Sequence, residues 1–188
     1  MKKFKRATMW VSHPYKWGQK YSLWPIQFCT GCGSIEIPPT MLAPWDASRF
    51  GMGPMATPRQ ANLLMITGYL TPKTLKAVIR TYEQMLTPKY VVAFGSCPID
   101  GGMYYMSYNT INHLDWYLAV DVWIAGCMPR PEAVLMGFNK LMEMIETGEA
   151  DGYIRYEKNL DYYRKNQERT LGKDFVESLK QLERTWRE

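Results

Sequence analysis

Short apolar runs alternate with longer amphipathic segments through the middle of the chain. The runs over residues 63–67, 90–94 and 120–125 are largely apolar, and a glycine follows each of them directly. Runs of this length and composition predict strands that are buried on both faces. A further apolar stretch over residues 22–28 predicts another strand, or an extended entry into the sheet.

Two segments next to these runs have apolar residues at helical spacing. The first begins at Thr71-Pro72, a hydroxyl N-cap followed by proline at the first helical position, and we expect Pro88 to stop it. The second begins at Pro131 and closes at Gly148. The residues expected on the buried faces are Leu75, Val78, Ile79, Tyr82, Met85 and Leu86, then Val134, Leu135, Phe138, Leu141, Met142 and Ile145. Strands that alternate with helices predict a doubly wound α/β domain with a mostly parallel sheet.

Two regions depart from this alternation. Residues 38–58 hold five prolines and three methionines without any period, which indicates an ordered loop that covers a site or a partner. After Gly152 the chain is polar and helical in character, and residues 173–187 carry a narrow apolar stripe that should pack on the protein itself or on a neighbouring subunit. We therefore divide the chain into an N-terminal arm (1–21), an α/β domain (22–150) and a C-terminal helical extension (151–188).

Charge is distributed unevenly over the 188 residues, whose net charge is +5. Residues 1–25 hold six basic and six aromatic residues and no acidic one, so this basic aromatic arm is expected to dock on a partner or on a membrane surface. Nucleic acid is not expected as a partner, because the rest of the chain shows no basic face or reading motif. Without a long apolar run or the features of a secretory signal, the chain is expected in the cytoplasm with reduced thiols.

All four cysteines follow predicted strands. Cys29 and Cys32 form a C-x-x-C motif after residues 22–28, while Cys97 and Cys127 follow the runs at 90–94 and 120–125. Because the carboxyl ends of parallel strands lie along one edge of a sheet, we expect the four thiols to converge there.

Four converging thiolates are compatible with more than one kind of site. A 4Fe–4S cluster takes one thiolate per iron and is favoured by the spacing. A structural zinc ion usually takes its ligands as two close pairs, and a dithiol redox enzyme needs only Cys29 and Cys32. Near the cysteines, Arg59 and Arg130 are candidate cations that would raise a cluster's potential, and Glu36 is a candidate proton-coupled group.

Several sequence blocks around these cysteines are similar to those of a known family. In chain order they are Cys29-Thr-Gly-Cys32-Gly-Ser-Ile-Glu36, residues 53–68 from Gly53 through Arg59 to Gly68, Tyr82-Glu-Gln-Met, Gly95-Ser-Cys97 with Gly101-Gly102, and Gly126-Cys127-Met-Pro-Arg130-Pro-Glu132. Over roughly residues 22–146 the chain resembles the small cluster-bearing subunit shared by respiratory complex I and the energy-converting membrane-bound hydrogenases.

This resemblance implies a flavodoxin-like fold with one 4Fe–4S cluster, whose ligands would be Cys29, Cys32, Cys97 and Cys127. Glu36 matches the family's acidic residue beside the first cysteines, and Arg59 matches its arginine near the cluster. The implied partners are a hydrogenase-large-subunit-like protein, a two-cluster ferredoxin-like subunit and a membrane arm. The subunit would then lie at the cytoplasmic side of the cell membrane as a peripheral member of the complex.

Two departures from the complex I pattern indicate the branch. Complex I has adjacent cysteines where this chain has the hydrogenase-like C-x-x-C, and Met128 stands where many relatives have a proline. The chain looks most like the archaeal ferredoxin-dependent branch linked to sulfane sulfur reduction, which implies transfer of electrons for sulfur or polysulfide reduction in an ion-pumping complex. The alternatives are a hydrogen-evolving nickel–iron complex, a quinone-reducing relative, a stand-alone dithiol enzyme and a zinc-stabilised scaffold subunit.

Overall fold

The centre of the molecule is a sheet of four parallel strands that follow one another in chain order. The computed structural model describes residues 14–53 and 56–187. The strands are β1 (Pro25–Cys29), β2 (Leu63–Thr67), β3 (Tyr90–Phe94) and β4 (Val122–Ile124). The predictions of strands over 63–67 and 90–94 are confirmed residue for residue.

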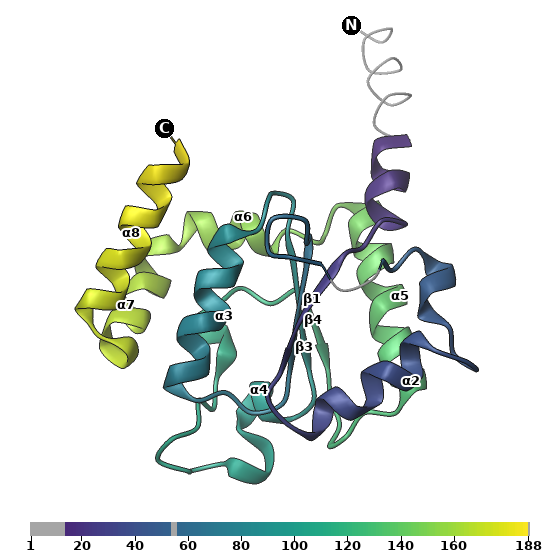
Figure 1. Ribbon diagram of the computed structural model, residues 1–188, viewed down its shortest axis with the longest axis horizontal. Helices are drawn as coiled ribbons and strands as arrows, with labels where there is room; N and C mark the ends of the chain where they lie inside the picture. The colour runs from purple at the N-terminus through teal and green to yellow at the C-terminus, as the bar shows by residue number, and fades with distance from the viewer. Residues whose placement is uncertain (1–13, 54–55, 188) are drawn as a thin grey trace, which may run out of the picture.

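Helices cover both faces of this sheet, which confirms the predicted doubly wound α/β class. In Figure 1, α3, α7 and α8 lie on one side of the strands, and α2 and α5 lie on the other. The helices are α2 (Ile37–Met41), α3 (Pro72–Gln84), α4 (Cys97–Asp100), α5 (Pro131–Thr147), α6 (Gly152–Lys158), α7 (Leu160–Leu171) and α8 (Lys173–Arg187). Short 3-10 turns complete the architecture at η1 (Cys32–Glu36), η2 (Ala47–Phe50), η3 (Gly102–Tyr104) and η4 (Leu114–Trp116).

The core is divided in two by the sheet, because successive side chains of a strand point to opposite faces. In β2, Leu64 and Ile66 pack with α3 and with Leu114 of η4, while Leu63 and Met65 pack against α5. The segment after β3 contains η4, which packs on the α3 face, whereas β4 is followed by α5 on the other face. This divergence opens a crevice at the carboxyl ends of β3 and β4, the place where open α/β sheets bind ligands.

Three details differ from the sequence-based expectation. β4 is shorter than the predicted run 120–125, because the Asp121 carboxylate accepts the N–H of Val91 at 2.9 Å and the regular ladder begins only at Val122. Leu86 is exposed instead of buried, because α3 ends at Gln84 and Met85 turns the backbone to an extended conformation.

The third difference concerns residues 38–58, where no regular structure was expected. The segment contains most of α2, which contacts α5, and all of η2, and its buried residues Ala47 and Met52 belong to the core cluster that contains α5. In the described structure it thus covers the protein's own core. The apolar content that suggested an ordered segment is explained by this packing.

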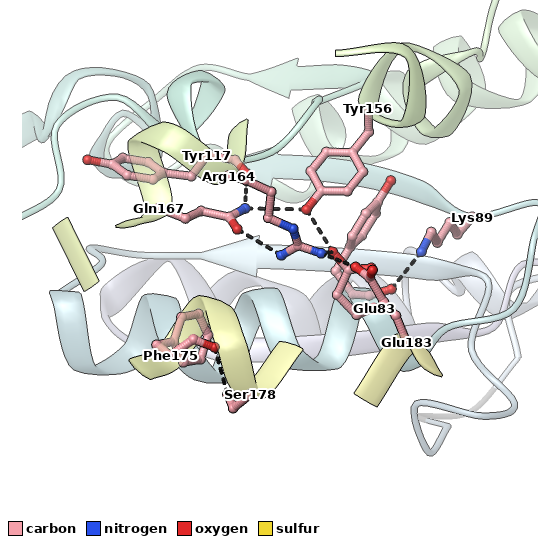
Figure 2. A network of polar contacts seen from close by, with 10 residues as sticks. Glu83, Lys89, Tyr117, Tyr156, Arg164, Gln167, Phe175, Ser178 and Glu183 are labelled. Atoms are coloured by element: carbon pink, nitrogen blue, oxygen red, sulfur yellow. Dashed lines mark hydrogen bonds and ion pairs between the residues drawn. The ribbon is translucent and has the colours of Figure 1, made fainter. Parts of the chain in front are cut away.

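The C-terminal helices form part of the α3 side of the molecule. Phe175 and Leu179 of α8 are buried in the same cluster as Leu75 and Val78 of α3. Figure 2 shows a polar network between these helices, in which Arg164 of α7 forms ion pairs with Glu83 of α3 and Glu183 of α8. The described part of the predicted apolar stripe, at Phe175 and Leu179, therefore packs on the protein itself.

Residues 14–20 form a helix beside the end of α5 (Figure 1). Lys16 Nζ donates to the carbonyl oxygen of Glu146 at 3.1 Å, and Lys20 Nζ forms an ion pair with the Glu146 carboxylate at 2.5 Å. The first thirteen residues of the predicted arm, with Phe4 and Trp10, lie outside the described residues. Within the described part of the chain, no helix has both the length and the apolarity needed to cross a bilayer.

Candidate thiol site at the carboxyl edge of the sheet

The cysteines stand at three strand ends on one edge of the sheet. Cys29 is the last residue of β1 and Cys32 the first of η1, while Cys97 begins α4 and Cys127 follows β4. Backbone hydrogen bonds continue past the strands, from Gly95 to Ile124 at 2.8 Å and from Ser96 to Gly126 at 2.9 Å. These bonds hold the segments that carry Cys97 and Cys127 side by side.

Three of the four cysteines line one small hollow in the crevice between β3 and β4. The lining residues are Cys32, Gly68, Phe94, Gly95, Ser96, Cys97, Gly126, Cys127, Met128 and Pro129. Residues from the β1, β2, β3 and β4 ends thus meet at one place, although up to 97 positions of sequence separate them. Convergence of the thiols, expected from strand order alone, is observed for Cys32, Cys97 and Cys127.

The turn that carries the C-x-x-C motif is fastened to the end of β2. The N–H of Thr30 donates to the carbonyl oxygen of Thr67 at 3.0 Å, and the Thr67 hydroxyl donates to the carbonyl oxygen of Phe28 at 2.7 Å. Gly68 has a φ of +100°, and a Cβ there would lie 2.6 Å from the nitrogen of Gly31. Only glycine allows the two backbones to approach this closely.

Cys29 is separate from the other three. It is exposed and does not belong to the lining of the hollow. Its Sγ instead accepts a hydrogen bond from Nε2 of Gln27 at 2.7 Å, two residues earlier on the same strand. The structure therefore brings together three thiols and leaves the fourth at the adjacent strand end.

Cys97 is the most enclosed of the cysteines, with 6% of its surface exposed. Burial raises the pKa of its thiol, and the neighbouring Cys127 and Cys32 groups raise that pKa further. A Cβ on Gly102 would lie 3.2 Å from the Cys97 sulfur, so the glycine backbone packs directly against it.

A set of thiolates from separate strand ends is the kind of donor set that an iron–sulfur group requires. No three His, Cys, Asp or Glu side chains among residues 14–53 and 56–187 are placed to hold one metal ion. Sulfurs around one zinc ion, each about 2.3 Å from the metal, would lie within about 4 Å of each other. In a four-iron cluster each thiolate binds a different iron, so wider spacing is required. Soft thiolates are the ligands that such clusters select.

None of the candidate non-cysteine residues lines the hollow. Glu36 is half-buried at the end of η1, and its carbonyl oxygen accepts the Thr40 hydroxyl at 2.6 Å. Arg59 is exposed in the turn before β2, at the opposite end of that strand from Thr67. Arg130 is exposed at the N-cap of α5, three residues after Cys127. These three residues could therefore influence a cluster only at longer range, without contacting the hollow.

Sequence reasoning missed one residue of the site, Gln27. Its position, two residues before a strand-end cysteine, places both side chains on the same face of β1, which the period of a strand makes predictable. Glutamine in a short strand draws little attention because its residue type has no strong association with thiol chemistry.

The chain is similar to proteins of one known family over most of its length. The family model described as NADH ubiquinone oxidoreductase, 20 Kd subunit, matches residues 29–141. A subunit of the F420H2 dehydrogenase of Methanosarcina mazei is 45% identical over 130 residues, covering 69% of this chain and 71% of that protein. A subunit of the NADH-quinone oxidoreductase of Phocaeicola vulgatus is 42% identical over 144 residues, covering 76% of this chain and 73% of its own length.

A solved structure is also similar. It is that of the membrane-bound sulfane sulfur reductase, described as an archaeal respiratory membrane complex. One of its chains matches with a TM-score of 0.83 at 59% sequence identity, covering 87% of this chain and 93% of that chain.

The fold and the grouped thiols define a parallel α/β domain with a thiol-lined site at the carboxyl edge of its sheet. The chain belongs to the NADH ubiquinone oxidoreductase 20 kDa subunit family, and it is accordingly a subunit of an oxidoreductase. The resemblance predicted from the cysteine blocks is confirmed, including the likeness to the sulfane sulfur reductase branch.

Proposed function

We propose that this chain is the electron-transfer subunit of a membrane-bound, ion-pumping respiratory complex and holds one 4Fe–4S cluster. When bound, the cluster would carry single electrons from a ferredoxin-fed chain of clusters to an active site at the interface with the large subunit. The proposed ligands are Cys32, Cys97 and Cys127 around the hollow, with Cys29 as the fourth donor from the adjacent strand end.

The observation that carries this proposal is the meeting of Cys32, Cys97 and Cys127 from three separate strand ends. A dithiol enzyme would use Cys29 and Cys32 and would give no reason for Cys97 and Cys127 to share a hollow with Cys32. A zinc-stabilised scaffold is less well supported because the described cysteines are not placed around one ion. All four cysteines are free in the structure, so no disulfide competes for the thiols.

The chain's own residues supply the environment for such a cofactor. Gly68, Gly95 and Gly126 line the hollow without side chains, so backbone can approach sulfur closely. Phe94 and Pro129 contribute apolar surface to its wall. Glu36 and Arg59 stay proposed as proton-coupled or potential-tuning groups, which would act on the site from beyond its lining.

Sulfur or polysulfide is the substrate we propose for the complex, with the chemistry on the large subunit. The support is the 59% identity to a chain of the sulfane sulfur reductase complex over 87% of the present chain. Hydrogen evolution and quinone reduction are the alternatives. The sequence of the large subunit would separate them, since a hydrogen-evolving nickel–iron centre requires both of that subunit's cysteine pairs.

The proposed partners are a hydrogenase-large-subunit-like protein, a two-cluster ferredoxin-like subunit and a membrane arm, with peripheral attachment at the cytoplasmic face. Support for docking near the cysteines comes from the loop after α4. Met103, Tyr105 and Met106 are 76%, 60% and 81% exposed there, and residues 101–114 contain no Asp, Glu, Lys or Arg. Uncharged apolar surface of this kind marks interaction sites.

The ligand assignment is tested by single substitutions. We expect Cys97→Ser and Cys127→Ser each to lose or remodel the cluster, because a hydroxyl is a harder and poorer ligand for these irons than a thiolate. Iron and acid-labile sulfide per chain are measured after anaerobic purification. Met128→Leu, which changes another residue of the lining, should keep full iron content. Wild-type iron content and turnover in both serine variants would remove these cysteines from the ligand set.

A further inference from the structure

Gln27 is the residue that makes contact with the isolated cysteine. Nε2 of its amide donates a hydrogen bond to Sγ of Cys29 at 2.7 Å. The two residues are separated by one position on β1, so their side chains project from the same face of the strand. Ile26 and Phe28 project from the other face and pack on the cluster that contains α3.

Pairing of β1 with β2 fixes the position of the Gln27 backbone along the strand. Gln27 pairs in register with Met65 of β2, and Cys29 pairs with Thr67. Met65 is buried and Thr67 is fully buried, so neither neighbour can shift without disturbing the core. The backbone that carries the amide is therefore held by rigid structure, which is what a residue needs in order to orient another side chain.

The other three thiols have the walls of the hollow around them, whereas Cys29 does not. An exposed cysteine at the end of a strand has several rotamers open to it. The amide of Gln27 is the contact that selects one of them in this structure. Its N–H also carries a partial positive charge directly at the sulfur.

We propose that Gln27 is a positioning residue that orients Cys29 and tunes the reduction potential of the site, an inference that rests on the proposed function. An N–H donated to a ligand sulfur withdraws negative charge from it and favours the reduced, more negative state of the site. Reduction adds one electron and neither makes nor breaks a bond in this chain. Without the Gln27 amide, the potential should fall.

The experiment compares three variants of the intact complex. Gln27→Met keeps the length and volume of the side chain but has no donor. Gln27→Lys keeps a donor of similar reach and adds a positive charge. Gln60→Met is the matched control, since Gln60 is exposed in the turn before β2. The readouts are iron per chain and the midpoint potential of the reduced paramagnetic signal in a redox titration.

We expect Gln27→Met to titrate at a lower potential than wild type, Gln27→Lys to titrate at or above it, and Gln60→Met to be unchanged. Loss of iron in Gln27→Met that is rescued in Gln27→Lys would also support the assignment, because only the second variant restores a donor. A Gln27→Met complex with full iron and the wild-type potential would overturn it, and so would loss of iron in both Gln27 variants. Absence of iron from the wild-type complex would instead refute the proposed function.

Discussion

Asp121 shows at the scale of one residue how the sheet is joined to the C-terminal extension. Its side chain has no exposed surface, and its carboxylate accepts the N–H groups of Val91 and Gly152, each at 2.9 Å. Arg155 of α6 lies 3.8 Å from it, and Asp151 is the other nearby charge. Burial raises the pKa of Asp121 above its ordinary value in spite of the two hydrogen bonds and the arginine.

The sign of the resulting pH dependence follows from linkage. A carboxyl with a higher pKa in the folded than in the unfolded chain binds its proton more tightly when folded, so its contribution to the free energy of unfolding falls as the pH rises. The fall begins near the unfolded pKa of about 3.9 and ends above the folded pKa. Asp121→Asn removes this titration.

We therefore expect wild type to lose stability relative to Asp121→Asn as the pH rises through the window that opens at the ordinary carboxyl pKa of about 3.9 and closes above the folded pKa. Urea unfolding at several pH values in this window measures the difference in free energy of unfolding. A difference that stays constant with pH, or that grows in favour of wild type, would contradict the burial effect assigned to this carboxyl.

Residue-level prediction succeeded where the backbone alone decides the outcome. Cys97 and Cys127 follow strands, and strand direction brings them to one edge. It failed where the exact end of an element decides, and it did not foresee which of the strand-end cysteines line the hollow. Cys29 has the same strand-end position but lies outside the hollow, and Leu86 follows the helical spacing but comes after the helix has ended.

At the scale of elements, α3, α7 and α8 are connected by a buried ionic network. The Arg164 side chain is 9% exposed, and its Nη2 lies 2.8 Å from Oε1 of Glu83. The hydroxyl of Tyr156 donates to the same Glu83 oxygen at 2.7 Å, and Gln167 accepts from Nη1 of Arg164 at 2.9 Å. Figure 2 shows that these groups converge between the helices. The network fixes the C-terminal helices on α3.

Removal of the arginine should be costly. Arg164→Met would leave the Glu83 carboxylate enclosed without its cation, and we expect the free energy of unfolding to fall by about 3–5 kcal/mol. Lys140→Met breaks the exposed pair with Glu143 on α5 and should cost less than about 1 kcal/mol. Chemical denaturation of both variants makes the comparison. Equal losses in the two would show that the network contributes no more than a surface ion pair.

The elements themselves were largely predictable from the sequence. Thr71 caps α3, in a box completed by Thr74, Pro72 opens its first turn, and Gly148 ends α5 in the left-handed conformation. Between residues 38 and 58 the hydrophobic pattern did not predict the helical turns, because α2 and η2 are each five residues or fewer and show no full helical period. The sequence also did not predict that the C-terminal stripe packs on α3, because that contact depends on the tertiary structure.

At the scale of the whole molecule, the thiol site and the N-terminal helix lie at opposite ends of the sheet. Figure 1 shows α4 at the end where the strands finish and residues 14–20 near the other end. The apolar loop after α4 belongs to the thiol end. A partner that exchanges electrons with this chain should therefore contact Met103 and Met106.

Loss of this contact can be measured directly. Burial of a methionine side chain contributes about 1.5–3 kcal/mol, so Met103→Ser/Met106→Ser should weaken assembly at least about tenfold. The share of tagged subunit that migrates with the membrane complex on native gels reports assembly, and iron per chain should not change. Met136→Ser, at a residue 72% exposed on α5, is the control. Assembly of the double variant at the level of the control would place the docking surface elsewhere.

Metal analysis of the anaerobically purified wild-type protein shows whether the four cysteines hold one 4Fe–4S cluster. We predict about four irons and about four acid-labile sulfides per chain, with a low-temperature paramagnetic signal after reduction. A protein that contains no iron would contradict the account in favour of a dithiol enzyme. A protein that contains zinc and gives no such signal would contradict it in favour of a zinc-stabilised scaffold.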